Sequence, residues 1–224
     1  MGDLLSILHT SDGSHSISSK NYQAAYHSIH GAIEESMHVF IAAGLYHQFV
    51  QGKKSIKILE MGFGTGLNAF LSLIAARKYG IDIEYHSIEL HPLSPSIYNA
   101  LNFHEQIPSS RQQDLISLHE AKWENLESID ALFKLKKIEG DLHQLQIDQD
   151  FDVIYYDAFA PSCQPDLWEA EIHQKLYNSL NQKGALVTYC AQGKFKRILK
   201  KIGYQLDKLP GPGRKHEMTR AVKA

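Results

Sequence analysis

The segment 56–76 constrains the fold of this chain more than any other part of its sequence. It begins with a short apolar run that is typical of a buried strand, and Glu60 follows that run. Three glycines then stand at alternate positions, Gly62, Gly64 and Gly66. A helix is expected from about Leu67. Glycine lets a backbone pass close to a ligand, because it has no Cβ and accepts positive φ angles, and a helix start offers free N–H groups. The unit predicts a binding site of the nucleotide type.

The spacing of the glycines separates two classes of cofactor. The dinucleotide fingerprint G-x-G-x-x-G requires its third glycine where this chain has Leu67, and the extra glycine, Gly66, stands one position too early. The pattern E-x-G-x-G-x-G resembles instead the first motif of class I S-adenosylmethionine methyltransferases, in which the loop passes the methionine and ribose parts of the cofactor. This resemblance favours S-adenosylmethionine over a dinucleotide. An ordinary tight turn between a strand and a helix is the remaining alternative.

A second acidic residue follows at a suitable distance from the glycines. The alternating segment 83–88 predicts a strand that ends at Glu89. An acidic side chain at the end of the second strand can accept hydrogen bonds from ribose hydroxyls. We therefore predict that Glu89 binds the ribose, with a solvated strand end as the alternative.

The composition is that of one globular domain over residues 1–224, with 43% hydrophobic and 21% charged side chains. No apolar run approaches the length of a membrane span, and the N-terminus lacks the basic and apolar regions of a signal peptide. The two cysteines imply no disulfide framework and favour a reducing cytoplasm. The thirteen histidines form no zinc motif, so no metal site is expected.

Alternating strand and helix patterns from residue 56 onward predict an α/β fold with a mainly parallel sheet. The expected strands cover 56–61, 83–89, 131–138, 151–157 and 184–190. The expected helices cover 66–79, 93–103, 108–119, 166–181 and 193–202.

The two ends of the chain are expected to differ from this core. Residues 1–50 are expected to form a Ser- and His-rich arm, with a helix over about 36–51 that packs on the 51–224 core. Segments 204–209 and 215–222 predict an antiparallel pair of strands, because the turn between them contains two Pro-Gly steps.

The C-terminal part of the chain is strongly basic. Residues 181–224 carry eleven Lys and Arg side chains against two acidic ones, a net charge of about +9, whereas residues 1–180 carry about −11. Such an asymmetry suggests an anionic partner for the basic segment. The alternative is a surface helix whose lysines are simply solvated.

The strand over 151–156 ends at Asp157. Ligands of open α/β sheets lie outside the carboxyl ends of the strands, so Glu60, Gly62, Glu89 and Asp157 are expected to gather at one edge. An aspartate beside a methyl donor suits an amine nucleophile, because it can accept a hydrogen bond from the N–H group or take up the proton. Phe159 is expected either to form a wall of this pocket or to pack in the core.

Two motifs around this strand end make the resemblance to known proteins specific. Tyr-Asp-Ala-Phe-Ala-Pro at 156–161 and Pro-Asp-Leu-Trp at 165–168 are similar to the signature of one group of methyltransferases. That group is the methyltransferase domain of the bifunctional tRNA 5-methylaminomethyl-2-thiouridine biosynthesis protein, with its stand-alone relatives. The resemblance extends over nearly the whole chain, through the segments 10–14, 26–28, 31–40, 60–68 and 209–218.

The resemblance implies a class I methyltransferase fold, Rossmann-like, with a seven-stranded, mostly parallel sheet whose last strand is antiparallel. It also implies a reaction, which is methyl transfer from S-adenosylmethionine to the amine of 5-aminomethyluridine, with or without a 2-thio group, at the tRNA wobble position. In this family Asp157 would face the amine and Asp141 the adenine edge. The other implied cofactor residues are Glu60, Gly62, Gly64, Gly66 and Glu89. The expected substrate or tRNA contacts are Phe159 at the pocket and, at the phosphates, Lys194, Lys196, Arg197, Arg214 and Lys215.

One departure from the family is informative. The bifunctional protein has an FAD-dependent oxidase that acts before methylation, and this chain has no second glycine fingerprint. We therefore expect methylation without oxidase activity. Two alternatives stay open, a methyltransferase for a small-molecule amine and a binding module that has kept the fold and lost the chemistry.

Overall fold

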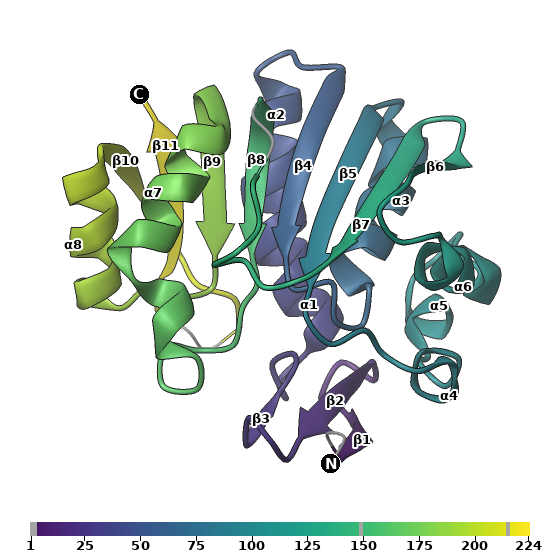
Figure 1. Cartoon of the computed structure of the whole chain (residues 1–224). Helices are drawn as coiled ribbons and strands as arrows, with labels where there is room; N and C mark the ends of the chain where they lie inside the picture. The colour runs from purple at the N-terminus through teal and green to yellow at the C-terminus, as the bar shows by residue number, and fades with distance from the viewer. Residues whose placement is uncertain (1–3, 148–149, 214–215) are drawn as a thin grey trace.

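The computed structural model describes residues 4–147, 150–213 and 216–224 (Figure 1). Its main sheet has eight strands, which are β4 (Ser55–Met61), β5 (Asp82–Glu89), β6 (Leu126–Asp130), β7 (Phe133–Glu139), β8 (Phe151–Tyr156), β9 (Leu180–Thr188), β10 (Tyr204–Leu209) and β11 (Met218–Lys223). Their order across the sheet is β10-β11-β9-β8-β4-β5-β7-β6. The strands from β9 to β7 in that order run parallel, whereas β11 is antiparallel to both of its neighbours.

This sheet confirms the predicted α/β class, with a mostly parallel sheet and an antiparallel last strand. It differs from the expected seven strands by the edge strand β6, which pairs antiparallel with β7. The segment 126–130 is half-buried and polar, and it has no apolar alternation from which a strand could be predicted. A tight turn joins the two strands, in which Leu132 N donates to Asp130 Oδ1 at 3.3 Å.

Helices cover both faces of the sheet and bury two separate hydrophobic clusters. Side chains alternate between the faces along β8, so that Val153 and Tyr155 enter one cluster and Ile154 and Tyr156 the other. The first cluster lies under α3 (Leu67–Tyr79), α4 (Pro95–Tyr98), α5 (Phe103–Gln106) and α6 (Gln112–Glu120). The second lies under the 3₁₀ turn η2 (Pro165–Trp168), α7 (Ala170–Ser179) and α8 (Gly193–Ile202).

The predicted helix over 93–103 is wrong as a single element, because α4 and α5 are two short helices with a break between them. Asn102 occupies that break and bonds to the N-terminal part of the chain. Its Oδ1 accepts a hydrogen bond from His15 N at 2.8 Å, and its Nδ2 donates to Gly13 O at 2.9 Å. A tertiary contact thus replaces the continuation of the helix.

The N-terminal arm contains structure that was not predicted. It forms a small antiparallel sheet of β1 (Leu5–His9), β2 (His15–Ser19) and β3 (Ala24–Ala25), which lies beyond the carboxyl ends of the central strands in Figure 1. A continuous helical segment follows, formed by α1 (Ala32–Ser36), the π-helix η1 (Met37–Tyr46) and α2 (His47–Val50). This segment packs on β8, β9 and α3, as expected for the helix over 36–51. Within the described ranges, no helix is both long and apolar enough to cross a membrane.

Gly44 allows η1 to pack directly on the sheet. A Cβ at this position would lie 2.9 Å from Tyr155 Cε1 and 3.0 Å from Val187 Cγ2, and both side chains are fully buried.

We expect Gly44→Val to lower the free energy of unfolding by about 1–3 kcal/mol, because neither neighbour can move without repacking the core. Urea denaturation measures the change. Ala42→Val, on the exposed side of the same helix, serves as the control and should cost less than about 1 kcal/mol. Equal effects of the two substitutions would contradict the packing argument.

Candidate active site

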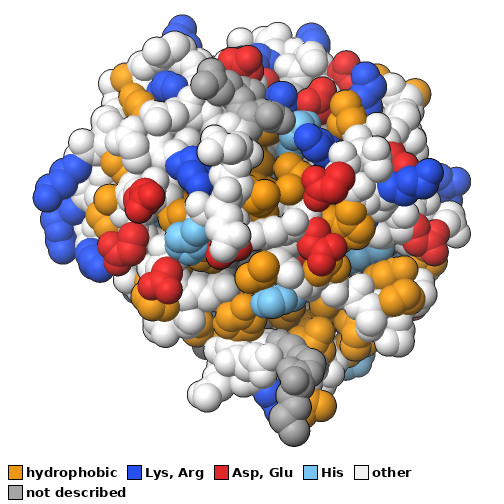
Figure 2. All heavy atoms as spheres, in the orientation of Figure 1, with side chains coloured by type: hydrophobic (Ala, Val, Ile, Leu, Met, Phe, Trp, Pro, Cys, Tyr) orange, Lys and Arg blue, Asp and Glu red, His pale blue; other side chains and the backbone are white. Residues whose placement is uncertain are grey.

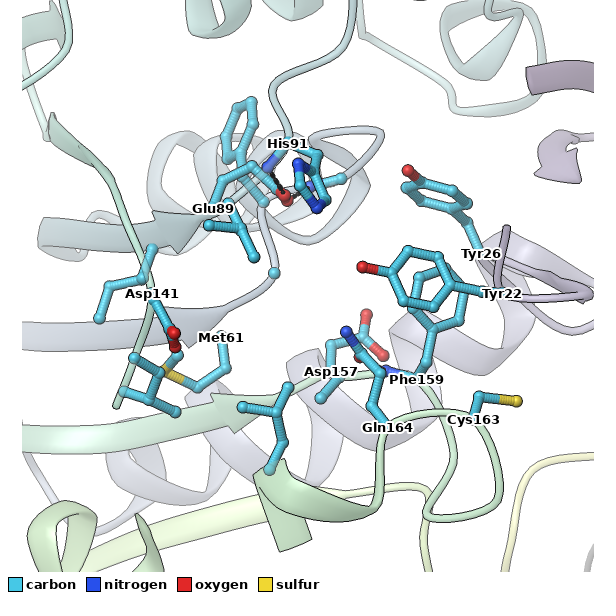
Figure 3. A pocket seen from close by; sticks show the side chains of 18 of the residues that line it. Tyr22, Tyr26, Met61, Glu89, His91, Asp141, Asp157, Phe159, Cys163 and Gln164 are labelled. Atoms are coloured by element: carbon cyan, nitrogen blue, oxygen red, sulfur yellow. Dashed lines mark hydrogen bonds between the residues drawn. The ribbon is translucent and has the colours of Figure 1, made fainter. Parts of the chain in front are cut away.

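A cavity of about 350 Å³ lies at the carboxyl ends of β4, β5 and β8 (Figure 3). Its size falls in the range of small-molecule sites. Glu89 and Asp141 lie on one side of it, and Asp157 lies on the other side below two tyrosines, Tyr22 and Tyr26. The cavity therefore has two halves, and chain segments far apart in sequence form them.

The glycine turn forms the floor between these halves. Gly62, Gly64 and Gly66 have φ angles of 87°, 50° and 72°, in the left-handed region that favours glycine. A Cβ at Gly62 would lie 3.3 Å from the backbone oxygen of Asp157, and one at Gly64 would lie 3.1 Å from Tyr26 Cδ1. Gly62 and Gly64 line the cavity, whereas Gly66 lies outside it and precedes α3. The first two glycines thus leave the backbone accessible from the cavity, and the third completes the turn before α3.

Glu89 connects the glycine turn to the loop after β5. Its Oε2 accepts a hydrogen bond from Gly64 N at 2.9 Å, and its Oε1 accepts one from His91 N at 2.7 Å. The carboxylate is therefore fixed at the cavity wall, where the strand end was expected to bring it.

Asp141 follows β7 on the same side of the cavity. Its Oδ1 accepts hydrogen bonds from His143 N at 2.9 Å and from His143 Nδ1 at 2.8 Å. These bonds, the backbone one first, hold the pKa of Asp141 below its ordinary value. The side chain is thereby kept as a charged acceptor beside Glu89.

Asp157 lies in the other half of the cavity with three aromatic rings. Asn68 Nδ2 donates a hydrogen bond to Asp157 Oδ2 at 2.8 Å. The Phe159 ring stacks on Tyr22 with a centroid distance of 4.5 Å and meets Tyr26 edge-on at 5.2 Å. We call Tyr22, Tyr26 and Phe159 the aromatic wall. The position of Phe159 supports the pocket alternative of the sequence analysis rather than the core alternative.

The signature at 165–168 explains how Phe159 is held. Trp168 Nε1 donates a hydrogen bond to Phe159 O at 2.8 Å, and Phe159 N donates to Gln164 Oε1 at 3.1 Å. Trp168 is itself buried between β8 and α8, against Tyr156 and Phe195. The motif therefore fixes the backbone of Phe159, and with it one ring of the aromatic wall.

Two histidines tie other elements to the glycine turn. His27 Nε2 lies 2.6 Å from Thr65 Oγ1, and His119 Nε2 lies 3.0 Å from Thr65 O. Burial lowers the pKa of each imidazole to about 4, so both are neutral at physiological pH. Neither they nor the two tyrosines of the aromatic wall were predicted as site residues, because no local pattern relates the arm, or the helix α6 that carries His119, to the glycine turn.

Glu60 does not line the cavity, contrary to the simplest expectation for the acid of the glycine motif. Its side chain is 1% exposed and accepts a hydrogen bond from Ser87 Oγ at 2.7 Å. Burial raises the pKa of Glu60 to about 8. The pairing of β4 with β5 and β8 places this residue within the sheet, behind the glycine turn.

The predicted phosphate contacts lie apart from the cavity. Lys194 pairs with Glu169 at 3.2 Å, and Lys196 pairs with Glu217 at 2.5 Å. Arg197 is exposed on α8. Two further predicted contacts, Arg214 and Lys215, lie outside the described residues. Figure 2 shows Lys and Arg side chains gathered at the edge of the molecule where Figure 1 places α8.

The sheet is open, and the glycine turn lies at the carboxyl end of β4, with acidic side chains at the ends of neighbouring strands. This arrangement is typical of enzymes that bind a nucleoside cofactor. The family model described as S-adenosyl-L-methionine-dependent methyltransferase matches residues 104–224. The chain belongs to this family, and S-adenosylmethionine is its cofactor.

Relatives among curated proteins are similar over most of the chain. The tRNA 5-methylaminomethyl-2-thiouridine biosynthesis bifunctional protein MnmC of Ralstonia nicotianae is 31% identical over 91% of this chain and 32% of its own length. The protein of the same name from Pseudomonas entomophila is 29% identical over 91% of this chain and 33% of its own length. The chain thus spans about a third of the length of these relatives.

Solved structures agree with the fold. The crystal structure of MNMC2 from Aquifex aeolicus has a TM-score of 0.82 and 25% sequence identity, and the match covers 98% of this chain and 70% of that one. Magnesium protoporphyrin IX methyltransferase from Synechocystis, solved with bound SAH, has a TM-score of 0.50 at 10% identity over 86% of this chain and 85% of its own. The second likeness concerns the fold alone.

The residues of the cavity fit S-adenosylmethionine. This cofactor has no pyrophosphate, so the site does not need the third glycine of the dinucleotide fingerprint. The backbone at Gly62 and Gly64 is open to the cavity, and Glu89 and Asp141 offer carboxylate acceptors on the same side. Among the described residues, no three His, Cys, Asp or Glu side chains gather as metal ligands would.

Proposed function

We propose that the protein transfers a methyl group from S-adenosylmethionine to the amine of 5-aminomethyluridine, with or without a 2-thio group, at the wobble position of tRNA. The observation that carries the proposal is the Asp157 carboxylate, which Asn68 holds at 2.8 Å between the glycine turn and the aromatic wall. The names of the curated relatives support it, since they describe biosynthesis of 5-methylaminomethyl-2-thiouridine in tRNA. Because the chain spans about a third of these relatives, the proposal covers methyl transfer alone. We expect this reaction in the cytoplasm, which the two free cysteines favour.

The proposed cofactor half consists of the glycine turn and the two acidic strand ends. Gly62 and Gly64 let the methionine part approach the backbone, Glu89 accepts the ribose hydroxyls, and Asp141 meets the adenine edge. Gly66 acts through the turn that it completes. S-adenosylmethionine supplies a methyl group on a sulfonium, whose thioether is a good leaving group.

Asp157 performs the proposed chemistry of the acceptor half. Its carboxylate accepts a hydrogen bond from the neutral amine and orients the nitrogen lone pair toward the methyl carbon. As the N–C bond forms and the C–S bond breaks, the nitrogen becomes cationic and the carboxylate stabilises that charge. Asp157 then takes up the proton that the nitrogen loses. The products are a secondary amine and a neutral thioether.

The aromatic wall suits a planar acceptor. RNA-binding proteins stack unpaired bases on aromatic rings, and enzymes that act on a base take it out of its stack. Tyr22 and Tyr26 come from the arm, whereas Phe159 follows Asp157 by two residues. We assign the wall to the uracil ring, with the aminomethyl group directed toward Asp157.

The exposed face of α8 is the proposed contact for tRNA phosphates. It presents Lys194, Arg197, Lys200 and Lys201.

We expect the double variant Lys194→Glu, Arg197→Glu to raise KM for tRNA by about tenfold and to flatten the salt dependence of binding. The reason is that fewer counterions are released from tRNA when the protein makes fewer phosphate contacts. KM measured over a series of salt concentrations tests this. The control is Lys54→Glu, Lys78→Glu, which reverses two exposed lysines just before β4 and in the last turn of α3. Equal salt slopes for wild type and the α8 variant would place the tRNA elsewhere.

One assay tests the proposed function as a whole. Purified protein is incubated with methyl-labelled S-adenosylmethionine and tRNA from a strain that lacks the final methyl group, and the nucleosides are then separated. Label in 5-methylaminomethyluridine or its 2-thio form is the expected result. A protein that binds the cofactor but transfers no label to this tRNA would overturn the proposal and favour a small-molecule amine or a binding role.

A further inference from the structure

A second carboxyl group is buried behind Asp157. Glu60, near the end of β4, is paired in register with Ser87 of β5 and Tyr155 of β8. The titratable groups that act on it are Tyr85 from β5, Tyr155 from β8 and Asp157 from the loop after β8. None of these three is a cation. Glu60 therefore faces a neutral and anionic environment.

Asn68 links the two carboxyl groups. This residue lies in the first turn of α3, is 2% exposed, and donates its Nδ2 hydrogen bond to Asp157 Oδ2 at 2.8 Å. A hydrogen bond from the same side chain to Glu60 opposes the larger effect of burial on the pKa of Glu60, so Asn68 contacts both acids. Its Oδ1 atom is buried and accepts no hydrogen bond from the described residues. The amide is thus held through its Nδ2 group.

Two carboxylates beside one amide cannot both be ionised without a large cost. Burial is the main cause that raises the pKa of Glu60 to about 8, and the charge of Asp157 raises it further. At neutral pH Glu60 therefore keeps its proton. The Asn68 amide then meets a single negative charge, that of Asp157.

We propose that Asn68 is a positioning residue that holds the Asp157 carboxylate toward the amine, and that Glu60 is a neutral buried acid whose ionisation disrupts this arrangement. The inference rests on the proposed role of Asp157 in methyl transfer. When Glu60 loses its proton, the second carboxylate competes for the Asn68 amide and repels Asp157. Activity then falls as the pH rises through the ionisation of Glu60, because the carboxylate that receives the amine is no longer held.

A titration tests the ionisation without any acceptor. The protein is labelled with ¹³C at the glutamate carboxyl groups, and the resonance missing from Glu60→Gln identifies Glu60. We expect this resonance to titrate several pH units above the exposed glutamates and its midpoint to fall in Asp157→Asn, which removes the neighbouring charge. A Glu60 that titrates with the exposed glutamates, or a midpoint that Asp157→Asn leaves in place, would overturn the inference.

Kinetics test the consequence for the reaction. In wild type we expect kcat to fall on the alkaline side, with the fall absent in Glu60→Gln and moved to higher pH in Ser87→Ala, because the Ser87 hydrogen bond stabilises the ionised form. Asn68→Ala should lower kcat by about 10- to 100-fold, the rate equivalent of one hydrogen bond to a charged group, with the Kd for S-adenosylmethionine unchanged.

The two proposals fail in different ways. If wild type transfers no methyl group to tRNA, the proposed function is wrong, and the carboxyl titration still decides the state of Glu60. If wild type is active but Glu60→Gln keeps the alkaline fall of wild type, or Asn68→Ala loses cofactor binding and kcat together, the positioning role is wrong while the function stands.

Discussion

Replacing Asp157 with alanine is expected to lower kcat for methyl transfer by about 10²- to 10⁴-fold, the range for removal of a positioned acid or base. The carboxylate is the group that can accept the N–H of the amine and take up its proton, and Asn68 holds it in place. Asp157 lies on the acceptor side of the cavity, away from Glu89 and Asp141 (Figure 3). The Kd for S-adenosylmethionine should therefore stay within a small factor of the wild-type value.

Single-turnover transfer of labelled methyl groups measures the rate, and calorimetry with S-adenosylmethionine measures the affinity. Asp82→Ala is a matched control, since Asp82 is exposed at the opposite end of β5. Turnover close to wild type in Asp157→Ala would remove this residue from the mechanism. A loss of cofactor affinity as large as the loss of rate would instead make it a cofactor ligand.

Replacing Glu89 with alanine is expected to weaken S-adenosylmethionine binding by about 2–4 kcal/mol, or about 30- to 1,000-fold in Kd. Two losses combine in this variant. The ribose hydroxyls lose their acceptor, and the N–H groups of Gly64 and His91 lose theirs. Because the Gly64 bond shapes the glycine turn, the floor of the cavity is expected to loosen as well.

Calorimetry of the apoprotein tests this expectation without any acceptor. Glu139→Ala is the control, since Glu139 is exposed and pairs with Glu89 in the register of β5 and β7 but lies outside the cavity. Glu89→Gln keeps one acceptor oxygen and should lie between wild type and Glu89→Ala. Wild-type affinity in Glu89→Ala would show that the residue only holds the loop after β5. Together, the two variants are expected to show that Glu89, in one half of the cavity, determines cofactor affinity and that Asp157, in the other half, determines the rate of methyl transfer.

Local patterns predicted the elements that carry the cofactor half. The apolar run in 56–61 and the alternation in 83–89 match β4 and β5 within a residue, and the glycine turn has the positive φ angles that its residues allow. Strand ends then brought Glu89 and Asp157 to one cavity, because parallel neighbours end at the same edge of a sheet. Periodicity and sheet geometry suffice for these residues.

The acceptor half depended on contacts between distant segments. Tyr22 and Tyr26 lie more than 130 residues from Phe159 in the chain, and no repeating pattern relates them. The small arm sheet is held partly by Asp12, which accepts hydrogen bonds from Ser14 N at 3.0 Å and from Glu34 N at 3.1 Å. Side chains and backbone groups that are not adjacent make these bonds, so the position of the arm could not be predicted from its composition.

The sequence by itself determined the strand, glycine turn and helix, the alternation of the central strands β4, β5, β7, β8 and β9 with helices, and the strand ends that carry Glu89 and Asp157. The physical reason is that backbone geometry and burial of a periodic face depend on neighbouring residues. Only the tertiary structure decided that the arm supplies two rings of the aromatic wall, that Lys194 and Lys196 pair with acids, and that Glu60 is a buried acid behind Asn68. Those outcomes depend on which layers pack together, and packing brings into contact residues that the chain itself keeps apart.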